Sequence, residues 1–223
     1  MEPRALRRDA LRNRARLVAA AREGLAEEGS GASLERVAAR AGVGIGTLYR
    51  HFPTREALIA AVFDAQLDEW LTAARAAAAS DDPWQGLCDY LGRTLELQAA
   101  HRALHEVFLQ NLPGDQFAGA REEIRCQLER LLERARAQGT LRADFTVSDL
   151  ALLLWSLGPV SEATAATAPQ AARRHLGFVL DGLRASAATP RAEPALTDDQ
   201  LAKAHRALRD SRRRPPPPAR AAG

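Results

Sequence analysis

The sequence predicts an all-α protein, and three observations lead to this prediction. Ala, Leu, Arg and Glu dominate the composition, and these residues favour helices. Apolar residues recur at steps of three and four along most of the chain, which is the period of an amphipathic helix. No segment alternates apolar and polar residues in the manner of a half-buried strand. The breaks between helical segments are short clusters that contain Gly, Pro, Ser or Asp, which predicts tight turns.

Composition also excludes several classes of protein. Apolar residues make up 46% of the 223 residues, which is enough to build a core and excludes general disorder. The apolar stretch over 150–161 is shorter than the roughly 20 residues that a membrane span needs. The N-terminal segment alternates Arg with Leu and Ala, unlike a secretory signal, and two cysteines are too few for a disulfide framework. We therefore expect a soluble, cytoplasmic protein.

Charge is unevenly distributed along the chain. Residues 1–60 hold eleven Arg and seven acidic residues, whereas residues 61–190 hold twelve Arg and seventeen acidic residues. Residues 191–223 are basic again, with seven Arg and one Lys against four acidic residues. A basic N-terminal part on an acidic body favours a polyanionic partner. The dominance of Arg can equally reflect the base composition of the genome, so charge alone does not decide between nucleic acid and no partner.

Three helices are predicted in the N-terminal part. The first carries an apolar stripe over 17–25. Ser33 is suited to cap the second, over 34–41, and Gly42 ends it because a left-handed backbone favours glycine. The third, over 44–52, follows after a single turn. Two short helices joined by a glycine turn are typical of a helix-turn-helix, whose second helix fits the major groove of DNA.

The residues of this segment carry a family resemblance. Residues 34–52 (LERVAARAGVGIGTLYRHF), followed by TREAL at 54–58, resemble the DNA-binding domain of the TetR family of one-component repressors. The match spans about residues 14–60, and GTLYRHF at 46–52 is its most specific part. Ordinary packing does not explain Tyr, Arg and His on one exposed face. The chain is identified as a member of this family.

The resemblance implies contacts to DNA phosphates and to base edges. Hydroxyl and imidazole groups at Thr47, Tyr49 and His51 correspond to phosphate contacts, which set register without reading sequence. Core packing for Tyr49 and a solvated position for His51 remain the alternatives. Ser33, as a cap, and Arg55, where the family usually has Lys beside a helix N-terminus, add phosphate contacts.

Base readout is expected at the start of the third helix and at Arg50. Arg50 can form a bidentate contact with guanine. Gly44 stands where the family often has Ser or Thr, which removes one candidate contact. The basic residues ahead of the first helix are either a flexible arm that enters the minor groove or a solvated tail; they are Arg4, Arg7, Arg8 and Arg12. The full set of expected DNA contacts is Ser33, Gly44, Ile45, Thr47, Tyr49, Arg50, His51 and Arg55.

Three regions are therefore expected. Residues 1–60 form the N-terminal arm and the three-helix DNA-binding domain, and residues 61–186 form a helical bundle that the resemblance assigns to effector binding and dimerisation. Residues 187–223 form a linker, a short helix over 197–210 and a disordered Arg/Pro tail. The body helices are predicted over 55–79, 84–101, 102–111, 116–138, 146–165 and 169–186, in a spacing similar to that of the SbtR-like group. The apolar stretch over 150–160 predicts a helix that is buried on several sides.

The family pattern implies a small-molecule effector and a homodimer. A cavity between body helices is one interpretation of a group of side chains for which core packing is the other: Trp84, Cys88, His105, Phe108, Phe117 and Trp155. His101 and His105 lie four residues apart without a third ligand, so no metal site and no cofactor are expected. The last two body helices, over about 146–186, are expected to pair across a two-fold axis.

The sequence thus predicts a sequence-specific regulator of transcription. The resemblance to the TetR family implies a homodimeric repressor that a small-molecule effector releases from a palindromic operator. The alternative is a DNA-associated regulator whose body binds a protein partner. An enzyme is not expected, because the chain has no glycine-rich phosphate loop, nucleophile elbow or paired metal motif.

Overall fold

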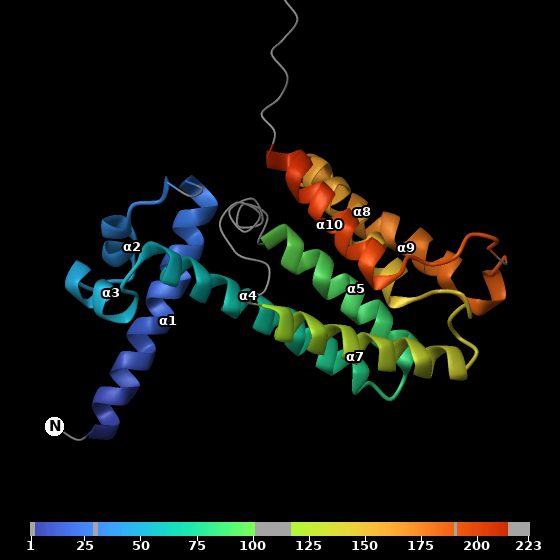
Figure 1. The fold of residues 1–223 in the computed structure, drawn as a ribbon, viewed down its shortest axis with the longest axis horizontal. Coiled ribbons are helices and arrows are strands. Elements are labelled where there is room, and N and C mark those ends of the chain that lie inside the picture. The colour runs from blue at the N-terminus through green and yellow to red at the C-terminus, as the bar shows by residue number, and fades with distance from the viewer. Residues whose placement is uncertain (1–2, 29–30, 101–116, 190, 214–223) are drawn as a thin grey trace, which may run out of the picture.

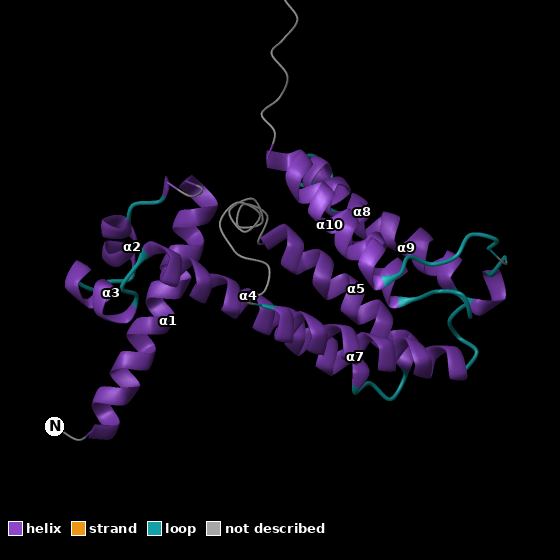
Figure 2. Cartoon of the chain, viewed as in Figure 1, coloured by secondary structure: helices purple, strands orange, loops and turns teal. Residues whose placement is uncertain are grey.

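The computed structural model describes residues 3–28, 31–100, 117–189 and 191–213, and these residues confirm the all-α prediction (Figure 1). Figure 2 shows only helices, turns and loops in the described part. The predicted helix over 102–111 lies outside the described residues. The α-helices are α1 (Pro3–Glu28), α2 (Leu34–Arg40), α3 (Ile45–His51), α4 (Arg55–Ala78), α5 (Pro83–Ala100), α7 (Ala118–Ala137), α8 (Val147–Thr164), α9 (Ala171–Leu183) and α10 (Asp198–Arg213).

The N-terminal head packs α1, α2, α3 and the first half of α4 around one core. Leu17 from α1, Leu48 from α3 and Leu58 from α4 are almost fully buried there, together with Val37 from α2. Burying each such side chain contributes about 1.5–3 kcal/mol. Because Leu48 and Phe52 face this core, the core fixes which face of α3 remains outside.

Local hydrogen bonds begin and end the helices of the head where the sequence predicts. The Ser33 hydroxyl accepts the backbone N–H of Arg36 at 3.3 Å, and Thr54 caps α4 in the same way at 3.1 Å. Gly42 adopts a φ of 63°, the left-handed conformation that ends α2. Hydroxyl caps therefore set the starts of α2 and α4, and Gly42 sets the turn between α2 and α3.

A second core forms the body from the end of α4 together with α5, α7, α8 and α9. The antiparallel pair α4 and α5 approaches closely at Gly86, where a Cβ atom would lie 2.7 Å from the carbonyl oxygen of Ala77. Only glycine allows this approach, so Gly86 sets the register of the two helices. The uninterrupted helix α4 contributes its first half to the head core and Ala74 and Ala77 to the body core.

Two further contacts hold the head on the body. Phe117, directly before α7, is 4% exposed and packs in the head core, and Ile124 on α7 touches both cores. Arg22 on α1 donates to Glu69 on α4 at 3.1 Å. The head is therefore joined to the body by α4 and by the start of α7, and the Arg22–Glu69 pair fastens α1 to the part of α4 that packs in the head.

The N-terminal arm is not the flexible segment that one interpretation of the sequence required. Helix α1 begins at Pro3, so Arg4, Arg7, Arg8 and Arg12 lie within a regular helix that projects from the head (Figure 1). Arg12 pairs with Asp9 one turn earlier. Good helix formers and an i,i+3 ion pair extend the helix beyond the part that the head core buries.

The C-terminal elements differ in length from the prediction. Helix α9 ends at Leu183 instead of 186, because Arg184 is extended and pairs with Leu141 in an isolated bridge. Helix α10 begins at Asp198 as expected, with Thr197 and Gln200 capping each other, and ends at Arg213 instead of 210.

Helix α8 is less buried than its apolar sequence predicts. Its N-terminus carries a full capping box between Thr146 and Asp149. Leu150 and Leu157 are buried, but Leu152 is 37% exposed and Trp155 is half-buried. The prediction of burial on several sides is therefore not met among the described residues, where the packed helices leave one side of α8 exposed.

Candidate nucleic-acid interface

Helix α3 presents an exposed face with mixed apolar and polar side chains. Ile45 is 38% exposed and Tyr49 is 47% exposed, and the two lie four residues apart on the same side of the helix. Arg50 is also exposed. Leu48 and Phe52 anchor the opposite face at 0% and 3% exposure. This division places the three side chains where an approaching polymer can reach them.

Thr47 and His51 lie at the margin of this face. Both are half-buried, so they are less accessible than Tyr49 and Arg50. The Nε2 atom of His51 is buried and makes no hydrogen bond to the described part of the chain. The His51 ring is tilted against Phe52, with 6.4 Å between ring centroids. The helix thus brings Thr47 and His51 to the edge of the same surface as Tyr49.

Two glycines leave the backbone at the start of α3 without side-chain cover. Gly44 is the N-cap, with an extended backbone and no side-chain cap, and Gly46 lies in the first turn. A Cβ atom at either position would meet nothing within 4 Å. The backbone at the beginning of α3 is therefore open to close approach from outside.

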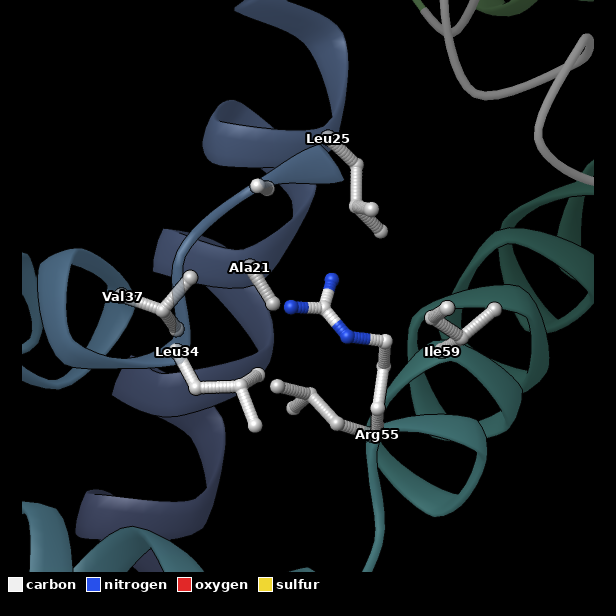
Figure 3. A pocket seen from close by; sticks show the side chains of 8 residues that line it. Ala21, Leu25, Leu34, Val37, Arg55 and Ile59 are labelled. Carbon is white, nitrogen blue, oxygen red and sulfur yellow. The ribbon is translucent and has the colours of Figure 1, made fainter. Parts of the chain in front are cut away.

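Ser33 directly precedes α2 and Arg55 begins α4, and both residues are half-buried. The Ser33 hydroxyl donates to Oε2 of Glu35 at 2.7 Å. Figure 3 shows the Arg55 guanidinium pointing toward Ala21 on α1, between α1 and the first turn of α4. The hollow that it enters is otherwise apolar; its lining residues are Ala21, Leu25, Ala32, Leu34, Val37, Leu58 and Ile59.

The carboxylate of Glu35 is stabilised in this arrangement. The hydrogen bond from Ser33 is the largest cause that lowers the pKa of Glu35, and the backbone N–H of Glu35 and the charge of Arg55 lower it further. Since Glu35 is exposed, it is an ionised group at the surface next to both expected phosphate contacts. Sequence reasoning treated residue 35 only as a member of the family pattern and missed this contact.

The four predicted effector residues that the structure describes do not all lie in one core. Trp84 and Cys88 lie on α5 against the body core, where the Arg184 guanidinium lies 4.5 Å from the centroid of the Trp84 ring. Burial raises the pKa of the Cys88 thiol. Phe117 packs in the head core and Trp155 is half-buried on α8. His105 and Phe108 lie outside the described residues.

Sequence reasoning also missed polar groups inside the body. Gln66 on α4 is 5% exposed, and its Oε1 atom has no partner in the described part of the chain. Gln98 on α5 donates to the carbonyl of Leu154 at 3.3 Å, while its Oε1 is likewise unpaired among those residues. Burial raises the pKa of Tyr90 to about 12. A polar residue at an apolar position of the helical repeat is the signal that would have found Gln66.

The described residues offer neither a membrane span nor a metal site. No helix there is long and apolar enough to cross a membrane. No group of three or more His, Cys, Asp or Glu in the same residues is arranged to hold a metal ion.

Helices α2 and α3 are short and are joined by a turn that contains Gly42, which is the arrangement of a helix-turn-helix protein. The chain belongs to the TetR family. Residues 17–62 match the bacterial regulatory proteins of the tetR family, and residues 82–185 match the C-terminal domain of SbtR-like transcriptional regulators.

Solved structures agree with this assignment. A TetR transcription regulatory protein from Mycobacterium vanbaalenii is 33% identical, with a TM-score of 0.63 over 80% of this chain and 99% of that one. A TetR transcriptional regulator from Streptomyces coelicolor is 34% identical, with a TM-score of 0.60 over 77% and 98%. The repressor SmeT of a Stenotrophomonas maltophilia multidrug efflux pump shares the fold at 20% identity, with a TM-score of 0.59 over 82% and 97%. A comparison with curated protein sequences gave no match.

Proposed function

We propose that this chain is a homodimeric transcriptional repressor that binds a palindromic operator and leaves it when a small molecule binds the body. The observation that carries the proposal is the exposed face of α3, with Tyr49 and Arg50 outside and Leu48 and Phe52 buried. A recognition helix needs this division, because its inner face must fix the helix while its outer face enters the major groove. The regulator would act in the cytoplasm, where such a protein meets DNA.

The side chains of this face divide into two roles. Arg50 is the base-reading residue, assisted by Gly44 and Ile45 at the open start of α3. Hydroxyl and imidazole groups at Thr47, Tyr49 and His51 hold phosphates, as do Ser33 and Arg55 once they turn outward.

Helices α8 and α9 support the proposed dimer. Phe178 on α9 is 61% exposed, with the Arg174 guanidinium 5.0 Å from its ring centroid, and Leu152 on α8 is 37% exposed. Large exposed apolar side chains on neighbouring helices are typical of a subunit interface. A two-fold axis between these helices would present two heads to two half-sites about 34–36 Å apart.

The body offers polar groups that a small molecule can use. The Oε1 atoms of Gln66 and Gln98, which have no partner among the described residues, are hydrogen-bond acceptors on the inner sides of α4 and α5. An unpaired buried acceptor costs free energy, which a ligand with a donor group would recover. A protein partner for the body remains the second candidate; removal of residues 187–223 without any effect on regulation would exclude that segment as its docking site.

Binding measurements on variants test the proposal. A genomic footprint at fixed salt first supplies the operator, and fluorescence anisotropy then gives the affinity for operator and random duplexes. We expect Tyr49→Ala and Arg55→Ala to weaken binding to both duplexes alike, and Arg50→Ala to relax sequence preference at one position by about 1–3 kcal/mol. Arg130→Ala, an exposed site on α7, is the control of equal charge change. A triple variant that combines Tyr49→Ala, Arg50→Ala and Arg55→Ala should lose operator binding. Wild-type affinity in this variant would refute the proposed interface.

A further inference from the structure

Two of the proposed phosphate contacts lie near the same acidic residue, Glu35. Ser33 precedes α2 and Arg55 begins α4. Leu34 and Arg55 line one hollow, so the first turn of α2 lies beside the first turn of α4. Glu35, the residue after Leu34, accepts a hydrogen bond from Ser33, and the charge of Arg55 is among the causes that lower its pKa.

The hydroxyl of Ser33 has only one proton to donate. In the structure it donates this proton to Oε2 of Glu35 at 2.7 Å, while its oxygen accepts the N–H of Arg36 at 3.3 Å. A phosphate oxygen is an acceptor and needs the same proton. Ser33 therefore cannot donate to DNA while it is bonded to Glu35.

Arg55 is also held away from a phosphate, in this case by the hollow that its side chain enters. Its guanidinium is half-buried in the hollow shown in Figure 3, and its positive charge is among the causes that lower the pKa of Glu35. A phosphate beside the N-terminus of α4 would have to attract this guanidinium away from the hollow and from the Glu35 carboxylate. The carboxylate thus offers the two groups what a phosphate would offer them: an anionic acceptor.

We propose that Glu35 is an intramolecular competitor of DNA phosphate, which must release Ser33 and Arg55 before the head grips the backbone. The inference rests on the proposed function and adds a residue that lowers affinity without reading sequence. Because phosphate contacts carry no sequence information, the competition weakens binding to operator and to random DNA by the same factor.

The experiment compares Glu35→Ala with Glu56→Ala in the full chain. Glu56 is a matched control, since each acidic residue is the second of its helix after a hydroxyl N-cap, each is exposed, and each change removes one negative charge from the head. Anisotropy titrations use the footprint operator and a random duplex at several salt concentrations. Thermal unfolding of both variants measures any loss of helix stability.

Glu35→Ala is expected to bind both duplexes about three- to tenfold more tightly than Glu56→Ala. This factor corresponds to the net free energy of one hydrogen bond, which the variant does not have to break before Ser33 donates to a phosphate. The plot of log affinity against log salt should keep the same slope in both variants, because the complex neutralises the same phosphates once Ser33 and Arg55 have left Glu35. A merely structural role of Glu35 would move the unfolding temperature without tightening the binding of either duplex.

Ser33→Gly removes the hydroxyl and so separates the effect of Ser33 from that of Arg55. Helix α2 should persist in this variant, because glycine is nearly as good an N-cap as serine. In that background the gain from Glu35→Ala should shrink. Equal affinities of Glu35→Ala and Glu56→Ala, or weaker binding by Glu35→Ala, would overturn the inference. If the wild-type protein still bound DNA in that case, the proposed function would stand. Absence of salt-dependent binding by every protein would overturn both.

Discussion

Replacement of Gly42 by alanine tests the turn that aims the recognition helix. Gly42 has a φ of 63°, and the N–H groups of Gly42 and Val43 donate to the carbonyls of Ala39 and Ala38 at 3.0 Å each. This pair of bonds is the Schellman motif, which places its glycine in the left-handed region. A Cβ atom there would also meet the guanidinium of Arg16, whose flexible end can move aside.

The cost follows from the backbone. A left-handed conformation costs an L-residue about 1–2 kcal/mol, and displacement of Arg16 adds little. For a chain of this size each kcal/mol lowers the unfolding temperature by about 2–4 °C, so Gly42→Ala should lower it by about 2–8 °C. Since strain in the turn also redirects α3, affinity for the operator should fall as well.

Gly139→Ala is the matched control. Gly139 ends α7 with a φ of 69° and the same hydrogen-bond pattern, and nothing lies within 4 Å of its Cβ position. It should lose similar stability but retain DNA affinity, because it lies in the body. Gly46→Ala, in the first turn of α3 at ordinary φ, should instead gain up to about 1 kcal/mol. Circular dichroism melting and anisotropy measure both quantities, and an unchanged melting temperature for Gly42→Ala would refute the reasoning.

The remaining predictions concern the dimer, acid stability and the start of α3. Phe178→Ser should raise the dissociation constant of the dimer at least about tenfold in sedimentation, through lost apolar burial, and an unchanged constant would exclude this face. The hydrogen bond from Arg142 lowers the pKa of Asp144 to about 2, so the ionised carboxylate stabilises the fold above about pH 4 and loses this effect as pH falls toward 2. Asp144→Asn should therefore be less stable than wild type in urea at pH 7, with a difference that narrows below pH 4; a constant difference would contradict this. Gly44→Ser should add a few tenths of a kcal/mol as an N-cap and tighten DNA binding modestly, and weaker binding would show that Gly44 is needed for close approach.

Local features of the head could be predicted from the sequence because they depend on neighbours along the chain. A hydroxyl three residues before an N–H makes a cap wherever the helix begins, as at Ser33 and Thr54. The left-handed Gly42 and the buried spacing of Leu48 and Phe52 follow from the same short-range rules. The boundaries of α2, α3 and α4 were therefore accessible without a structure.

Long-range placement was not accessible in this way. As a large aromatic residue, Phe117 was a candidate for lining the effector pocket. It packs in the head core instead, because α7 runs along α4 and brings its first turn to that core. Arg184 ends α9 early because its backbone pairs with Leu141, 43 positions away. No periodicity in the sequence encodes these contacts.

The sequence by itself determined the all-α class, the helix-turn-helix and the side chains of α3 that face outward, since a helix of period 3.6 with two buried anchors has only one free face. The tertiary structure alone decided where the charged ends of these side chains lie. Arg55 enters the hollow between α1 and α4, and Ser33 donates its one proton to Glu35. Rotamers of long or polar side chains are chosen by the neighbours that folding assembles, and those neighbours come from distant parts of the chain.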